Sequence, residues 1–129
     1  MAYGPLMTSR TIPLLAALLL AATPVLATPA KPTPPATVES LLADAHSATA
    51  KGDIELALRL AQSAIVADPA RPASYVALGD IYAETGQPDY ARSFYDAALG
   101  IDPAEPSALR ALSVLDHEQR TASTANAAR

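Results

Sequence analysis

Hydrophobic residues recur at helical spacing along most of the chain, in short stretches that Gly and Pro separate. Tyr75, Leu78 and Tyr82 fall at i, i+3 and i+7, which places them on one stripe of a helix. Gly86 follows this stripe, as is typical of a helix C-terminus, and Pro88 suits the first turn of a second helix. The pattern therefore predicts two helices joined by a tight turn.

The second of these helices is expected to end at Asp102, because Pro103 disfavours helical geometry at the residue before it. Its apolar stripe mixes small and large side chains, and consists of Ala91, Phe94, Tyr95, Ala98 and Leu99. Small residues that face large ones allow two antiparallel helices to approach closely. We expect this pair to form a packed hairpin.

The same arrangement occurs twice, at a spacing of 34 residues. The segment Asp68-Pro69-Ala70-Arg71-Pro72 returns as Asp102-Pro103-Ala104-Glu105-Pro106, and Gly52 aligns with Gly86. These residues mark chain reversals, so they carry more weight than the alanines that also match. The spacing predicts repeats at 38–71 and 72–105 and a last helix at 106–120, with Leu109, Leu112 and Leu115 on its apolar stripe.

The first repeat is expected to pack less densely than the second. Its helices are predicted from Val38 to Ala50 and from Ile54 to Ala67. Asp44 stands where Leu78 stands in the second repeat, and Ala48 stands where Tyr82 stands. The last helix likewise has Asp116 in place of an aromatic residue, which is typical of a capping helix.

With this period and these motifs, the chain resembles the tetratricopeptide repeat (TPR) family. The second repeat carries the family pattern at Tyr75, Leu78-Gly79, Tyr82, Gly86, Ala91, Tyr95, Ala98 and Pro103. The resemblance implies an all-α, right-handed α-solenoid over residues 37–120, with two helix-turn-helix units and a capping helix. An unrelated five-helix bundle is the alternative.

The resemblance also implies a concave groove that the first helix of each unit lines and that holds a protein or peptide segment. The groove residues expected from it are Leu42, His46, Val76, Asp80, Arg110, Val114 and His117. Of these, Leu42, Val76 and Val114 would hold apolar groups, and His46, Asp80 and Arg110 would fix polar ones. Two repeats and a cap are near the minimum for such a fold, so dimerisation or docking on a partner is a hypothesis for completing its core.

Composition narrows the chemistry further. The chain has no Cys, which excludes a zinc-thiolate site and a thiol nucleophile, and its Gly residues are too isolated for a phosphate-binding loop. A net charge of −4 argues against nucleic acid as a partner. We expect neither enzymatic activity nor a cofactor or metal. The alternative is a small-ligand or metal-binding accessory protein that uses His46, Asp80 and His117.

Residues 1–27 have the features of a secretory signal peptide. Arg10 precedes an unbroken Leu/Ala run from Leu14 to Ala22, and Ala27 provides a small residue for cleavage. Cleavage there predicts that the protein is periplasmic or secreted. Together with the TPR resemblance, it predicts a small exported bacterial TPR protein that binds an envelope protein. The alternative is a leader that is retained and holds the protein on the inner membrane.

Two segments are expected to be disordered. Residues 28–36 are rich in Pro and predict an extended linker. Residues 121–129 are small and polar, with nothing to bury, and predict a disordered tail.

Overall fold

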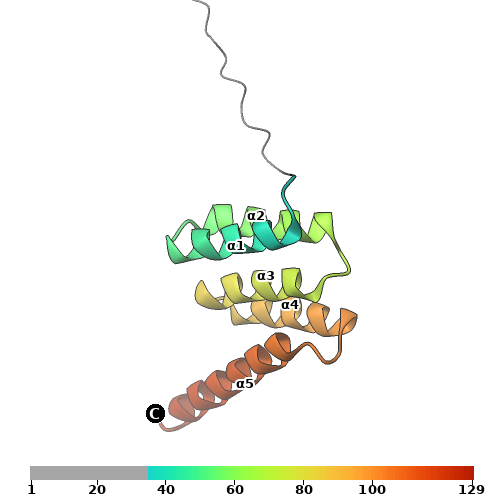
Figure 1. Cartoon of the computed structure of the whole chain (residues 1–129). Helices are drawn as coiled ribbons and strands as arrows, with labels where there is room; N and C mark the ends of the chain where they lie inside the picture. Colours follow the sequence, from blue (N-terminus) through green and yellow to red (C-terminus); the bar gives the residue numbers. More distant parts are fainter. Residues whose placement is uncertain (1–34) are drawn as a thin grey trace, which may run out of the picture. The chain divides into compact units, whose positions relative to one another are not determined.

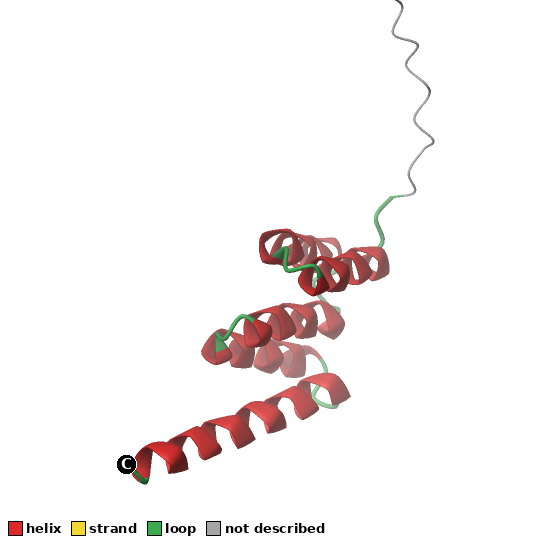
Figure 2. Ribbon diagram, turned by 90° about the vertical axis from the view of Figure 1, so that its left-hand side faces the viewer, coloured by secondary structure: helices red, strands yellow, loops and turns green. Residues whose placement is uncertain are grey.

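The protein folds into α-helices that stack in layers, as the computed structural model shows for residues 35–129, the residues that it describes. Figure 1 and Figure 2 show two helical hairpins and a last helix lying obliquely beneath them. No strand occurs among these residues. The helices are α1 (Val38–Ala50), α2 (Ile54–Ala67), α3 (Pro72–Glu84), α4 (Pro88–Ile101) and α5 (Pro106–Ala127). The predicted all-α architecture of two hairpins and a further helix is confirmed.

Local sequence explains where the helices begin. The side chain of Thr37 accepts a hydrogen bond from the Ser40 amide at 3.1 Å, and Asp53 accepts one from the Leu56 amide at 3.1 Å. Such caps satisfy amides that have no partner within the helix, and each is worth about 1 kcal/mol. The later helices α3, α4 and α5 each begin with Pro, whose missing amide costs nothing in the first turn.

The chain reversals of the two hairpins have the same hydrogen bonds. Gly52 and Gly86 adopt φ angles of +80° and +75°, a left-handed conformation that favours Gly over any residue with a side chain. The Asp53 amide donates to the Ala48 carbonyl at 2.9 Å. At the equivalent place 34 residues later, the Gln87 amide donates to the Tyr82 carbonyl at 2.9 Å. The turns that the repeat spacing predicts are therefore structurally equivalent.

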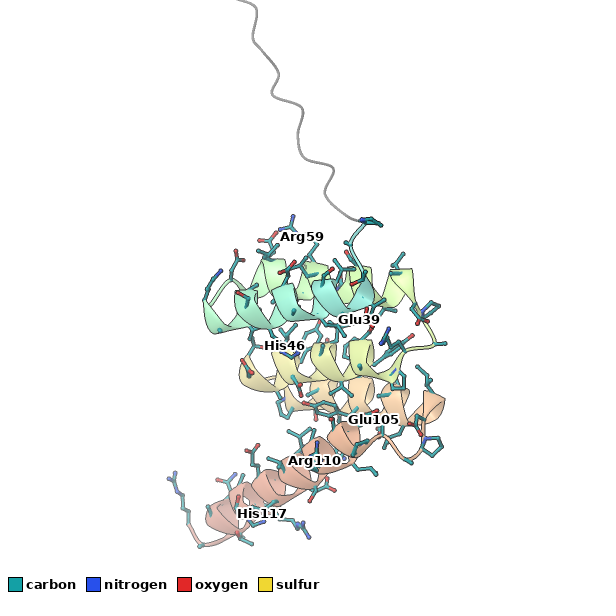
Figure 3. All side chains as sticks on the ribbon, viewed as in Figure 1. Glu39, His46, Arg59, Glu105, Arg110 and His117 are labelled. Carbon is teal, nitrogen blue, oxygen red and sulfur yellow. The ribbon has the colours of Figure 1, made fainter. Side chains whose placement is uncertain are left out.

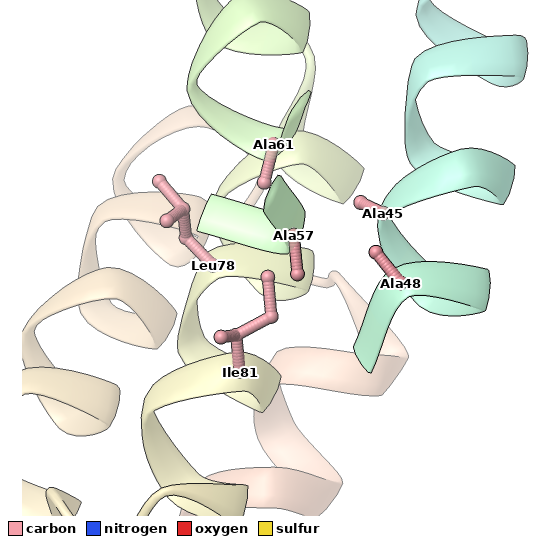
Figure 4. Close-up of a cluster of buried hydrophobic side chains, with 6 residues drawn as sticks. All are labelled: Ala45, Ala48, Ala57, Ala61, Leu78 and Ile81. Carbon is pink, nitrogen blue, oxygen red and sulfur yellow. The ribbon is translucent and has the colours of Figure 1, made fainter. Parts of the chain in front are cut away.

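Two hydrophobic clusters hold the layers together, and α3 contributes to both. The first joins the first hairpin to α3 through Ala45, Ala48, Ala57, Ala61, Leu78 and Ile81 (Figure 4). The second joins the second hairpin to α5 through Val76, Ala91, Tyr95, Ala98, Ala108 and Leu115. Because most of these side chains are small, the helices come close together. The layers are thus stabilised by close contact between helices rather than by one large core.

The closest approach within the second hairpin is between Gly79 on α3 and Tyr95 on α4. A methyl group added at Gly79 would lie 2.5 Å from Cε1 of the Tyr95 ring. The ring is almost fully buried, so it has little room to move away. Gly at this position is therefore required by packing, since the backbone of α3 touches an aromatic ring there.

An aromatic stack also joins the two helices of this hairpin. The ring centroid of Tyr82 lies 5.4 Å from that of Tyr90 and 5.4 Å from that of Phe94, with the Phe94 ring nearly parallel to it. Tyr82 is half-buried at the centre of the stack, whereas Tyr90 is 61% exposed at its edge. The central ring therefore makes more of the contacts.

The prediction of a disordered tail over residues 121–129 is wrong, because α5 continues to Ala127. This segment contains no Gly or Pro that would end the helix, and it is rich in Ala, the best helix former. The hydroxyls of Thr121 and Thr124 also bond back to carbonyls of the preceding turn, at 2.8 and 2.9 Å. Residues 116–129 are nevertheless all exposed, as expected for a segment with nothing to bury. The predicted signal peptide and most of the predicted linker lie outside the described residues.

Replacing Gly79 with Ala should destabilise the protein by about 1–3 kcal/mol, since the new methyl group overpacks the contact with Tyr95. Gly100 provides a matched control, because it lies within α4 with no atom within 4 Å of an added methyl group. Gly100→Ala should stabilise the protein by about 0.5–1 kcal/mol through helix propensity alone. Urea unfolding measures both, and equal shifts would contradict the close approach.

Removing the central ring of the stack should cost more than removing the edge ring. We expect Tyr82→Ala to lower the free energy of unfolding by about 2 kcal/mol or more, as for loss of a packed aromatic side chain. Tyr90→Ala should cost about 1 kcal/mol or less, because its ring is largely in water. Equal melting shifts for the two variants would show that the assigned helix faces are wrong.

Candidate interaction surface

The predicted groove residues come from the first helix of each layer, namely α1, α3 and α5. We call these residues the first-helix face, and they are Leu42, His46, Val76, Asp80, Arg110, Val114 and His117. Figure 3 shows His46 on α1, and Arg110 and His117 on α5.

Most of this face is open to solvent. His46, Arg110 and His117 are exposed, Leu42 is half-buried, and Val114 is 55% exposed. The Arg110 guanidinium donates a hydrogen bond to the Ser107 hydroxyl at 3.3 Å, within its own helix. The face thus offers apolar contact at Val114 and Leu42, beside polar groups that remain accessible.

Val76 does not belong to the accessible surface, and here the structure corrects the sequence-based prediction. Its side chain is only 8% exposed and packs in the second cluster with Tyr95, Ala108 and Leu115. Ala108 and Leu115 belong to α5, so the last helix covers the site that Val76 would otherwise offer. Contact between layers therefore takes the place of partner contact at this position.

Asp80 is half-buried and already engaged. The Tyr95 hydroxyl donates a hydrogen bond to its Oδ1 atom at 2.7 Å. Burial of the ring raises the pKa of the Tyr95 hydroxyl well above its usual value, and the hydrogen bond to Asp80 and the negative charge of that carboxylate raise the pKa further. The phenol is therefore protonated at neutral pH and holds the carboxylate in place. Through this hydrogen bond, Asp80 links α3 to α4.

Exposed ion pairs link residues of neighbouring layers. Arg71, which precedes α3, pairs with Glu39 at the start of α1. A backbone hydrogen bond at Glu39, and then the charge of Arg71, hold the pKa of the Glu39 carboxyl below its usual value. Arg92 of α4 pairs with Asp116 and donates to Gln119 Oε1 at 3.3 Å, which ties α5 to the second hairpin. Such exposed pairs add little stability but favour one arrangement.

His46, Asp80 and His117 do not form a metal site in the structure. Among residues 35–129, no group of three His, Cys, Asp or Glu side chains is arranged to hold a metal ion. Within the same range, no helix combines the length and the apolar character that crossing a bilayer requires.

A pocket of about 310 Å³ lies between α1 and α2, away from the first-helix face. Its lining residues are Asp44, Ser47, Ala48, Lys51, Asp53, Leu56 and Leu60. We call it the α1–α2 pocket. This pocket was not predicted from the sequence, although the signal was present, since Ala48 stands where the second repeat has Tyr82. A second pocket of about 390 Å³ runs along the exposed half of α5, and its lining residues are Asp116, Gln119, Arg120 and Ser123.

Comparison with known proteins agrees with the fold. The family model of the tetratricopeptide repeat matches residues 48–115, more than half of the chain, from the end of α1 to the middle of α5. A comparison with curated proteins finds no match. The equivalent turns, the stacked hairpins and this match lead to one conclusion: the chain belongs to the tetratricopeptide repeat family.

Proposed function

We propose that this protein is an exported scaffold, and that its first-helix face binds an extended or helical segment of an envelope protein. Tetratricopeptide repeats generally bind other proteins, and the family is in general a non-catalytic scaffold. The observation that carries the finer proposal is the exposed part of the first-helix face. Val114 presents an apolar side chain there that is 55% exposed among the described residues.

The polar residues of this face fit the same role. His46 on α1 and Arg110 and His117 on α5 are all exposed. Side chains of this kind hydrogen-bond to the backbone or to charged groups of a bound segment, while apolar residues anchor it. Because Val76 is buried and Asp80 is engaged by Tyr95, the proposed contacts are strongest on α1 and α5.

Export is supported by the charged, apolar and small-residue pattern of residues 1–27. If the leader is cleaved after Ala27, the protein isolated from its native host should begin at Thr28. N-terminal sequencing measures this directly. A sequence that starts at Met1 or Met7 would contradict cleavage and would favour the same scaffold anchored on the inner membrane.

Two exposed valines allow a matched test of the binding face. Val114 lies on the first-helix face, whereas Val66 lies on α2 and is 84% exposed. A photoreactive phenylalanine analogue at position 114 should crosslink one envelope protein in living cells, and the same analogue at position 66 should not.

The crosslinked segment then serves as the binding probe. Val114→Glu should weaken its binding about tenfold or more, because a carboxylate must be desolvated where an apolar contact was made. Val66→Glu should change the affinity less than about twofold. Crosslinking from position 66 alone, or equal losses in the two variants, would contradict the proposed face.

A further inference from the structure

The second hairpin shows what fills the place that is equivalent to the α1–α2 pocket. In the second hairpin, the ring of Tyr82 is stacked between Tyr90 and Phe94, at centroid distances of 5.4 Å to each. The residues 34 positions earlier, at the same places in the first hairpin, are Ala48, Leu56 and Leu60. All three line the α1–α2 pocket. The pocket therefore occupies the place that an aromatic ring fills in the second hairpin.

The walls of this pocket are suited to a ring. Ala48 forms a buried floor, Leu56 is 37% exposed, and Leu60 is half-buried. The two leucines stand where Tyr90 and Phe94 flank the ring of Tyr82. An aromatic side chain that entered here would cover apolar surface on both of its faces, which is the main source of its binding energy.

The rim of the pocket adds a polar requirement. Asp53 already accepts a hydrogen bond from the Leu56 amide, as the cap of α2. Asp44 and Ser47 on α1 and Lys51 at its C-cap are exposed and complete the rim. An exposed carboxylate beside an apolar pocket favours a ring that carries an O–H or N–H donor. Tyrosine and tryptophan meet this requirement, whereas phenylalanine does not.

The described part of the chain has no aromatic side chain to spare for the pocket. Tyr95 is buried against Gly79, Tyr82 and Phe94 are stacked on each other, and the half-buried Tyr75 donates its hydroxyl to the Pro69 carbonyl at 3.1 Å. Even the exposed Tyr90 is stacked on Tyr82, so a second copy would have to give up that contact to supply a ring. The remaining aromatic residue of the sequence, Tyr3, lies outside the described residues, in the predicted signal peptide, and is lost if the leader is cleaved after Ala27. In the cleaved protein, the ring would therefore come from another protein.

We infer that the α1–α2 pocket is a second binding site, which receives a tyrosine or tryptophan side chain of a partner protein. This site lies between α1 and α2 and shares no residue with the first-helix face. The inference does not depend on the function proposed for that face. A partner held at both places would lie across the first hairpin. The ring would take the structural place that Tyr82 takes in the second hairpin.

The pocket can be tested with N-acetyl-tryptophanamide as the probe and the full chain labelled on its Leu methyl groups. The probe should shift the Leu56 and Leu60 methyl resonances upfield in a saturable way, because they would lie over the ring faces. N-acetyl-leucinamide should shift them less than a tenth as much. Absence of the shift with the tryptophan probe would overturn the inference.

Ala48→Tyr provides the matching variant, since it restores in the first hairpin the ring that the second hairpin has. It should abolish the probe-induced shifts and raise the midpoint of urea unfolding. Ala67→Tyr, at an exposed position at the far end of α2, should leave the shifts unchanged. Shifts that persist in Ala48→Tyr, or that vanish in Ala67→Tyr, would place the probe elsewhere and overturn the inference. If Ala48→Tyr fails to fold, the comparison of the two probes on the unchanged protein still decides the question.

Sedimentation velocity tests whether a second copy of this protein, instead of a different partner, fills the pocket. Without probe, the protein should sediment as a monomer at the protein concentrations used for the probe titration. A dimer that forms without probe and is lost in Ala48→Tyr would assign the pocket to a second copy and overturn the proposal of a different partner.

Discussion

The fold depends on how closely its helices can approach α3. Six of the thirteen residues of this helix are buried, against three of thirteen in α1. It meets the first hairpin through Leu78 and Ile81, and the second cluster through Val76. Such crowding is possible because side chains at the contacts are small: Ala57, Ala61, Ala91, Ala98 and Ala108 all have no exposed surface, and Gly79 lies against a ring. In a small domain with few large core residues, dispersion contacts at short range replace the volume of a larger core.

Much of the fold could be predicted because its chain reversals are specified locally. Turn residues are local signals. Gly52 and Gly86 adopt a positive φ that the turn itself requires, whatever packs around it, and Pro at the start of a helix needs no tertiary contact. Their repetition at 34 residues was therefore enough to place the helices. Exposure was harder to predict. Val76 occupies a groove position by its spacing, yet the path of α5 across it decides that it is buried, and no local pattern specifies that path. The end of α5 was likewise missed, because a polar Ala-rich segment can be helical without burying anything.

The two hairpins share a backbone but differ in their side chains. The second closes on itself through the Tyr82 stack and the hydrogen bond from Tyr95 to Asp80. The first has Ala48 at the centre of the equivalent place, and a pocket results. One half of the protein thus completes its own packing, while the other half leaves apolar surface available. In a repeat fold each unit depends on its neighbours, so the end with the incomplete unit is where a partner gains most from binding.

Native-state hydrogen exchange tests the central place of α3 most directly, because it reports the stability of each helix separately. The amides of α3 and α4 should exchange most slowly, those of α1 and α2 faster, and those of α5 beyond Leu115 nearly as fast as in an unfolded chain. Equal protection in all five helices, or slowest exchange in the first hairpin, would contradict the view that close packing around α3 holds this protein together.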